Sequence, residues 1–195
     1  MNIISNHFKC IGGWIMLKKV IIAGFLGGLT LMIWLFIVNG IFGFRNRLDM
    51  KQIPDERQVY EMLKRNIVEP GRYICNPELT PEGTFQQNVP VFGILYGGMG
   101  HEAAGMQLIL EFILAILTAT TGAWLLSLTS EKTITNYWRK VFFFTILGGL
   151  IAIYSSINNF GIGSYPVKDA LILAIHTIIV WTVVGLVVAW RIKPN

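Results

Sequence analysis

The sequence carries little charge. Only 14% of its 195 residues are Asp, Glu, Lys or Arg, whereas 53% are hydrophobic. Soluble domains carry about 25% charged residues, so this composition excludes an ordinary soluble protein and indicates a membrane protein. The net charge of +5 does not indicate a nucleic-acid partner, because Lys and Arg form no cluster with interleaved aromatic residues. Many basic residues instead flank apolar stretches, where they meet lipid headgroups.

Cysteine is also scarce, and no redox or metal motif is present. Cys10 and Cys75 stand on either side of the first apolar stretch, so we expect them on opposite sides of the membrane, unable to pair. The absence of Cys-x-x-Cys disfavours thiol–disulfide exchange, and we interpret Cys75 as a small buried apolar residue. His101 and Glu102 do not begin a His-Glu-x-x-His zinc motif, because Gly105 stands where the second histidine would be. The sequence therefore predicts no metal and no cofactor.

Four apolar stretches are long enough to cross a bilayer, which takes roughly 20 residues. They cover about 20–44, 104–128, 141–160 and 170–190. Since lipid-exposed backbone must satisfy its own hydrogen bonds, we predict an all-α membrane fold, a four-transmembrane-helix bundle that forms a single domain. The first stretch exceeds the 7–15 residues typical of a signal peptide core, so we predict a retained anchor. Residues 1–15 read as an upstream extension, because Met16 begins an ordinary membrane-protein start.

Residues 45–103, the intervening segment, are predicted to form a small extracytoplasmic α+β cap. The stretch "IPDERQVYEMLKRNI" has apolar residues at helical spacing, acids in its first turn and bases near its end. "RYIC" and "VPVFGILYG" read as two strands separated by turn residues. About 60 residues of this kind bury too little surface to be stable alone. We expect their apolar face to rest on the outer ends of the membrane helices.

The orientation follows from the positions of Lys and Arg. Both sides hold equal numbers, but the basic residues are denser in the short segments next to the termini and in the loop at 129–140. This favours cytoplasmic termini in a bacterial inner membrane. Arg45 and Arg47, directly after the first stretch, favour the opposite orientation.

A resemblance supports this location. "LKKVIIAGFLGGLTLMIWLF" followed by "IPDERQVYEMLKRNIVEPGRYICNP" resembles a group of bacterial four-helix inner-membrane proteins. They share a Gly-Gly first span, a Pro-Asp-Glu helix and a Pro-Gly-x-Tyr strand. The resemblance covers roughly the first 80 residues, and it implies no activity and no site residues. The layout is also similar to claudin-like proteins in topology alone, because their Trp and paired-Cys signature is absent.

Each predicted helix has a stripe of small or polar residues, which typically packs toward the inside of a bundle. The stripes are Gly24, Gly28, Leu35 and Asn39; Gln107, Glu111, Thr118 and Gly122; Gly148, Ala152, Ser155 and Asn159; Asp169 and His176. At 1.5 Å per residue, Glu111 and His176 lie at a similar depth, roughly 10 Å from the outer ends of their helices. We therefore predict an intramembrane polar pocket in the outer leaflet. Its members are Glu111, His176, Gln107, Asn39, Ser155 and Asn159.

An ionisable residue within a membrane costs about 2.5–3.5 kcal/mol and marks a candidate functional site. Glu111 is the first such candidate. It either belongs to a protonatable pocket for a proton, a lipid or a quinone headgroup, or stays neutral and fixes helix packing through a hydrogen bond. His101 and Glu102 are weaker candidates, because they precede the second helix, where an exposed polar turn is usual.

Two classes of function remain open. The first is a non-catalytic membrane protein, an accessory subunit or an assembly or scaffold factor of a membrane complex, with the bilayer and a protein partner or a second copy as its contacts. The alternative is a lipid-, quinone- or proton-handling protein that uses the pocket around Glu111 and His176. An enzyme is disfavoured, because no nucleophile and base can be placed together on one side of the membrane.

Overall fold

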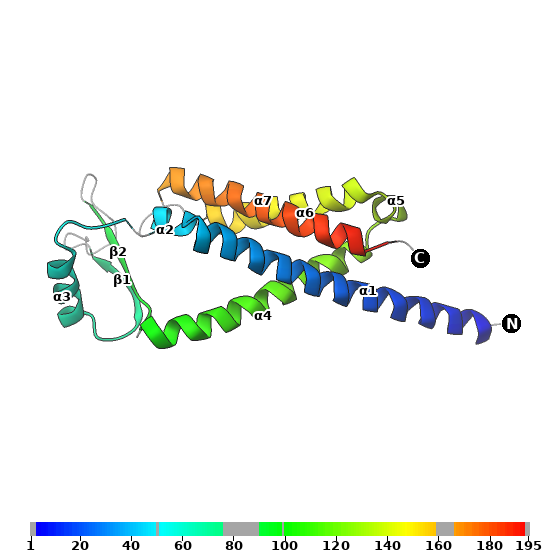
Figure 1. Ribbon diagram of the computed structural model, residues 1–195, viewed down its shortest axis with the longest axis horizontal. Helices are drawn as coiled ribbons and strands as arrows, with labels where there is room; N and C mark the ends of the chain where they lie inside the picture. The colour runs from blue at the N-terminus through cyan, green and yellow to red at the C-terminus, as the bar shows by residue number, and fades with distance from the viewer. Residues whose placement is uncertain (1–2, 50, 76–89, 99, 159–165, 194–195) are drawn as a thin grey trace, which may run out of the picture.

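The computed structural model describes residues 3–49, 51–75, 90–98, 100–158 and 166–193, and the side chains of all of these except 3–15, 49 and 100–104. Its helices are α1 (Ile3–Leu35), α2 (Phe44–Asp49), α3 (Glu56–Asn66), α4 (Gly100–Ser127), α5 (Glu131–Ile134), α6 (Tyr137–Ile151) and α7 (Val167–Arg191), with π-helical turns η1 (Phe36–Ile41) and η2 (Ala152–Ile157). The strands are β1 (Gly71–Cys75) and β2 (Phe92–Tyr96). The start of α1 and the end of α7 lie at one end of the bundle, and α2, α3 and the strands lie at the other, the distal end (Figure 1).

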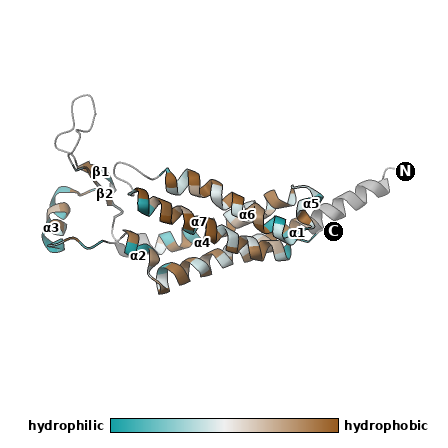
Figure 2. Ribbon diagram, turned by 90° about the horizontal axis from the view of Figure 1, so that it is seen from above, coloured by the Kyte–Doolittle hydropathy of each residue, from teal (hydrophilic) through white to brown (hydrophobic). Residues whose placement is uncertain are grey.

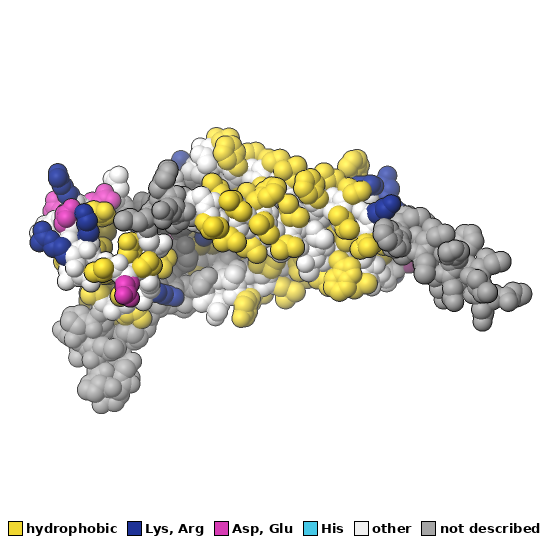
Figure 3. Space-filling view, turned by 90° about the horizontal axis from the view of Figure 1, so that it is seen from below, with side chains coloured by type: hydrophobic (Ala, Val, Ile, Leu, Met, Phe, Trp, Pro, Cys, Tyr) yellow, Lys and Arg dark blue, Asp and Glu magenta, His cyan; other side chains and the backbone are white. Residues whose placement is uncertain are grey.

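The four predicted membrane spans are confirmed as helices that are long and apolar enough to cross a bilayer. They run over Met16–Ile41, Gly105–Ser127, Tyr137–Ile157 and Val167–Arg191. Hydrophobic residues colour the bundle over most of its length, and hydrophilic residues gather in α2 and α3 (Figure 2). Hydrophobic side chains also cover the bundle surface, with Lys and Arg towards its two ends (Figure 3). This distribution is that of a protein whose middle lies in lipid.

The intervening segment contains the predicted helix and the two predicted strands, which pair antiparallel from Gly71↔Tyr96 to Cys75↔Phe92. Its predicted packing is wrong for α3, which buries no residue and faces β2 across an open groove instead of resting on the membrane helices. Cys75 was predicted to be buried, but it is a free, exposed cysteine at the end of β1. A two-stranded sheet has two faces, and a single short helix can cover only one of them. Apolar side chains of the segment therefore stay exposed.

Helices α1 and α4 cross at two glycines spaced four residues apart, as in the small-residue motifs of membrane helices. A Cβ atom added to Gly24 would stand 2.4 Å from the Cα of Thr120, and one added to Gly28 would stand 2.7 Å from the Cα of Ile116. The backbones therefore meet without intervening side chains. On the distal side of this crossing α4 diverges from α1 (Figure 1).

The core lies at the end of the bundle that holds the termini. Phe144 of α6 is fully buried, and its ring stacks on Trp181 of α7 at a centroid distance of 6.2 Å. A Cβ atom on Gly122 of α4 or Gly185 of α7 would stand within 3 Å of Phe144. Two glycines thus form the slot that this ring fills, and α4, α6 and α7 are joined there.

The end of α7 is held by two lysines. The ammonium group of Lys140, which is 4% exposed, donates to the carbonyl of Ile192, and Lys19 donates to the carbonyl of Lys193 at 3.2 Å. The last carbonyls of a helix lack partners within the helix and carry partial negative charge. The two lysines therefore tie α1 and α6 to the end of α7.

We expect Lys140→Met to destabilise the bundle by about 2 kcal/mol, because the variant leaves a buried carbonyl without the charged donor that it has in the native protein. The unfolding midpoint in mixed micelles of sodium dodecyl sulfate and dodecyl maltoside measures the loss. Lys132→Met on α5, where the lysine is exposed, is the control. An equal loss in both variants would show that general charge removal, and not the α7 contact, is responsible.

Candidate functional site

A cavity of about 320 Å³ opens at the distal end, between α1 with η1 and α2 on one side and η2 and α7 on the other. Its walls are apolar, from Leu31, Leu35, Phe44, Leu173, Val180 and Trp181. Its polar groups come from Asn39, Arg45, Ser155, Ser156, His176 and Thr177. An apolar cavity with a few convergent polar groups is the usual form of a ligand site.

Both helices that turn π-helical do so beside this cavity. η1 supplies Asn39, and η2 supplies Ser155 and Ser156. A π-helical turn departs from the normal i→i−4 pattern and so rotates the side chains that follow it, and such turns are frequent at functional sites. Two separate helices show this rare geometry at the same end of the bundle, and in both cases it places polar side chains in the cavity wall.

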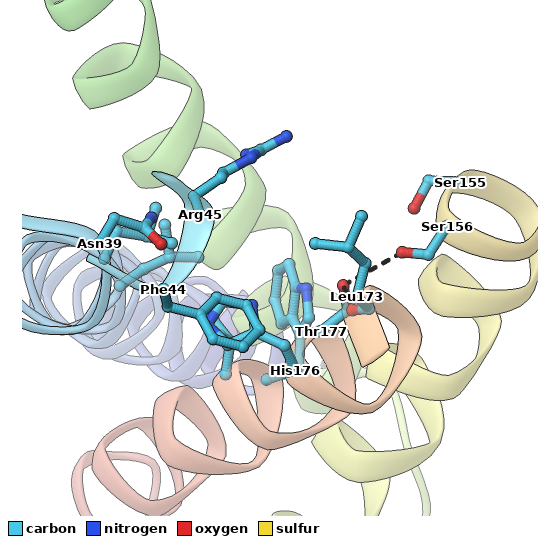
Figure 4. Close-up of a pocket in the computed structure, with 12 residues that line it drawn as sticks. Asn39, Phe44, Arg45, Ser155, Ser156, Leu173, His176 and Thr177 are labelled. Carbon is cyan, nitrogen blue, oxygen red and sulfur yellow. Dashed lines mark hydrogen bonds between the residues drawn. The ribbon is translucent and has the colours of Figure 1, made fainter. Parts of the chain in front are cut away.

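Two polar atoms of the cavity wall are buried without a hydrogen-bond partner in the described part of the chain. They are Oδ1 of Asn39 and Nε2 of His176. The imidazole of His176 stacks on the ring of Phe44, with centroids 4.8 Å apart, and both rings face the cavity (Figure 4). Stacking fixes the plane of the imidazole but does not satisfy its nitrogen. A buried unsatisfied polar group costs about 1–3 kcal/mol, so these two atoms favour a ligand that bonds to them.

The hydroxyl groups of Ser155 and Ser156 on η2 and of Thr177 on α7 already make hydrogen bonds within the chain. Thr177 donates to the carbonyl of Leu173 at 2.9 Å, and its oxygen lies 3.4 Å from that of Ser156 (Figure 4). Ser155 donates to the carbonyl of Ile151 at 2.7 Å. Since Thr177 uses its proton within its own helix, Ser156 is the donor of that pair, and the lone pairs of these oxygens can still accept.

Glu111 and Gln107 do not belong to the cavity, and this part of the predicted pocket is wrong. Both are exposed on α4, where Gln107 donates to Oε1 of Glu111 at 2.9 Å. Every residue from 105 to 114 is exposed. The physical reason is the close crossing of α1 and α4, from which α4 diverges towards its beginning. Glu111 and His176 were predicted to share a depth, but they do not share a cavity.

His101, Glu102 and Asn159 were also predicted as candidate site residues. His101 and Glu102 lie in the first turn of α4, not before it, and their side chains lie outside the described residues. Asn159 also lies outside the described residues. Of the predicted pocket, the structure therefore brings together Asn39, Ser155 and His176. Among the described residues, no group of three His, Cys, Asp or Glu side chains could hold a metal ion.

Phe44, Arg45 and Thr177 line the cavity but were not predicted as site residues. Thr177 follows His176 directly, yet neighbours in a helix point about 100° apart, so helical spacing separated it from the polar face. Phe44 and Arg45 belong to the short helix α2, which begins directly after Gly43, a glycine with a φ of +61°. The sequence Gly43-Phe44-Arg45, directly after an apolar span, was the one feature from which these two site residues could have been predicted.

Fold and site together define a class, an integral membrane protein of four helices with a polar cavity at one end of the bundle. No protein-family model, no curated protein and no solved structure matches the chain.

Proposed function

We propose that this protein is a non-catalytic subunit or scaffold factor of a membrane complex, and that its partner binds the exposed half of α4, residues 105–114. The observation that carries the proposal is the complete exposure of this stretch, within the least buried of the four spans. The other spans bury one face against the bundle, as membrane helices do. A transmembrane helix of another protein would give α4 the same kind of neighbour.

The Gln107–Glu111 pair supports a protein partner over lipid. Gln107 satisfies one oxygen of the carboxyl group, and lipid tails offer nothing to the other polar atoms. Polar side chains in a span hydrogen-bond across helices, with gains of about 0.6–2 kcal/mol each. A partner helix with a complementary donor would relieve the cost of placing this pair within the membrane.

The intervening segment supports the same proposal. α3 buries no residue, and Tyr60, Met62, Ile74 and Leu95 are exposed large hydrophobic residues. A lone two-stranded hairpin is marginally stable in water. We propose that this segment is an extracytoplasmic cap that gains its remaining contacts from the partner.

We further propose that both termini are cytoplasmic and that the membrane is the bacterial inner membrane, as in the group that the first 80 residues resemble. The start of α1 and the end of α7 at one end of the bundle (Figure 1) support a common side for the termini. The density of Lys and Arg in the short segments there supports the cytoplasmic side.

The double variant Gln107→Leu/Glu111→Leu is expected to weaken partner binding about threefold to thirtyfold, which is the equivalent of losing one interhelical hydrogen bond. A photo-crosslinking residue placed at Leu108 in cells is expected to yield one stoichiometric partner, and the double variant is expected to reduce the yield. The fold should be unaffected, because both side chains are exposed. Glu111→Gln, which keeps the hydrogen bonds, is expected to retain the partner.

Thr118→Val is the matched control. Thr118 is exposed on the same helix, and its hydroxyl already donates to the carbonyl of Leu114 at 2.6 Å, so its loss should leave the crosslink unchanged. A crosslink to lipid alone, or only to a second copy of this chain, would contradict the proposed subunit role.

A second candidate function is ligand handling at the membrane surface. The cavity at the distal end favours it through its unsatisfied polar atoms, and His176 rather than Glu111 is then the central residue.

A further inference from the structure

The cavity at the distal end has a definite preference in charge. Arg45 lies in its wall, and no Asp or Glu is among the described residues that line it. A guanidinium group has five N–H donors, so Arg45 can bind an anion beside any contact that it makes within the chain. Guanidinium groups pair especially well with phosphate. The cavity is therefore suited to a phosphate group and unsuited to a cation.

The unsatisfied atoms add a second requirement. Oδ1 of Asn39 accepts a hydrogen bond and does not donate one, and Nε2 of His176 donates or accepts according to its tautomer. The ligand must therefore donate at least one hydrogen bond near its phosphate. A hydroxyl group does this, because it can donate to Asn39 or to the free lone pairs of Ser156, and it also accepts from His176. A quinone carbonyl can only accept, and an ammonium headgroup would bring a positive charge next to Arg45.

Size and position set the third requirement. A volume of about 320 Å³ is at the lower end of ligand cavities, enough for a small polar headgroup but not for a whole lipid. The cavity opens near the end of the candidate span Met16–Ile41, where α2 begins, and we therefore place its mouth near the level of the lipid headgroups. Leu31, Val180 and Trp181 extend its wall into the apolar part of the bundle, along which an acyl chain can lie.

We infer that this cavity binds a phosphate diester or monoester with a hydroxylated headgroup, the chemistry of a phosphatidylglycerol-type lipid. The phosphate bonds to Arg45, and the headgroup hydroxyls bond to Asn39 and His176. This site does not involve α4, so it stands independently of the proposed partner surface.

Native mass spectrometry of the full-length protein, released from vesicles of equal phosphatidylglycerol, phosphatidylethanolamine and phosphatidylcholine, tests the inference. We expect phosphatidylglycerol to be retained at least tenfold over the other two. Arg45→Gln should lower its retention about tenfold. Arg47→Gln, on the same short helix but outside the cavity, is the matched control for charge and should leave retention unchanged.

His176→Phe separates ligand binding from folding. The variant keeps an aromatic ring to stack on Phe44 but loses the unsatisfied nitrogen, so its thermal stability without lipid should be equal to the native value or higher. Its lipid retention should nevertheless fall about tenfold. Asn39→Leu, of similar shape, should act in the same way.

Soluble glycerol 3-phosphate distinguishes the two sources of this chemistry. If it displaces the lipid at millimolar concentration, the site recognises the headgroup alone and a free phosphate ester is a ligand in its own right, which supports the inferred chemistry. If it does not, the acyl chain contributes and the ligand is the lipid. Equal retention of the three lipids, or unchanged retention in both His176→Phe and Asn39→Leu, would overturn the inference.

Discussion

Replacing Gly24 by leucine is expected to separate α4 from α1 and to destabilise the bundle by about 3 kcal/mol. The new Cβ atom would stand 2.2 Å from Oγ1 and 2.4 Å from Cα of Thr120. A clash with backbone cannot be relieved by a side-chain rotation, so the helices must move apart. Overpacking of this kind costs about 1–3 kcal/mol, and the contact with backbone places Gly24 at the upper end of that range.

Gly149 provides the matched control, because a Cβ atom added there meets nothing within 4 Å. Gly149→Leu should keep or slightly raise stability, since leucine favours a helix over glycine by somewhat less than 1 kcal/mol. Unfolding in mixed micelles measures both variants, and spin labels at the exposed positions Ile21 and Leu117 report the distance between α1 and α4. If both glycine variants behave alike, the crossing does not depend on close backbone contact.

Phe144→Ala is expected to cost about 3 kcal/mol, because it empties the slot between Gly122 of α4 and Gly185 of α7. Soluble cores lose about 3–5 kcal/mol for such a change. A value at the lower end is expected here, since lipid tails are as apolar as the core and only the packing is lost. The loss should appear as a lower midpoint of unfolding. Phe142→Ala, where the ring is 63% exposed, should have little effect.

The slot also allows a test by a double-mutant cycle. Gly122→Ala alone should destabilise the protein, because its Cβ atom would stand 2.9 Å from Cε1 of Phe144. In the Phe144→Ala background the clash is gone and the added methyl group occupies part of the empty space, so the same change should be neutral or stabilising. Simple additivity of the two changes would show that Phe144 does not fill the slot that the glycines form.

The candidate site was predictable in part. Asn39, Ser155 and His176 were predicted to meet from the polar stripes of their helices, and the structure places them around one cavity. Glu111 was placed in the pocket by its predicted depth, but it is exposed on the part of α4 that diverges from α1. Position along the helix axis alone therefore misplaced it. Arg45 follows the break between η1 and α2 at Gly43, whose φ of +61° is a matter of backbone conformation and not of helical spacing.

The sequence by itself determined that four helices are long and apolar enough to cross a membrane and that a helix and two strands stand between the first two of them. These are consequences of local apolar length and of the hydrogen bonds that each segment must satisfy internally. It also determined which stripes of small residues allow helices to approach, as at Gly24 and Gly28. Only the tertiary structure decided where these stripes stop meeting. The angle at which two helices cross depends on side chains of both helices at once, and the crossing of α1 and α4 leaves Glu111 exposed. His176 lies beside a cavity that is formed by other elements, between α1 with η1 and α2 on one side and η2 and α7 on the other.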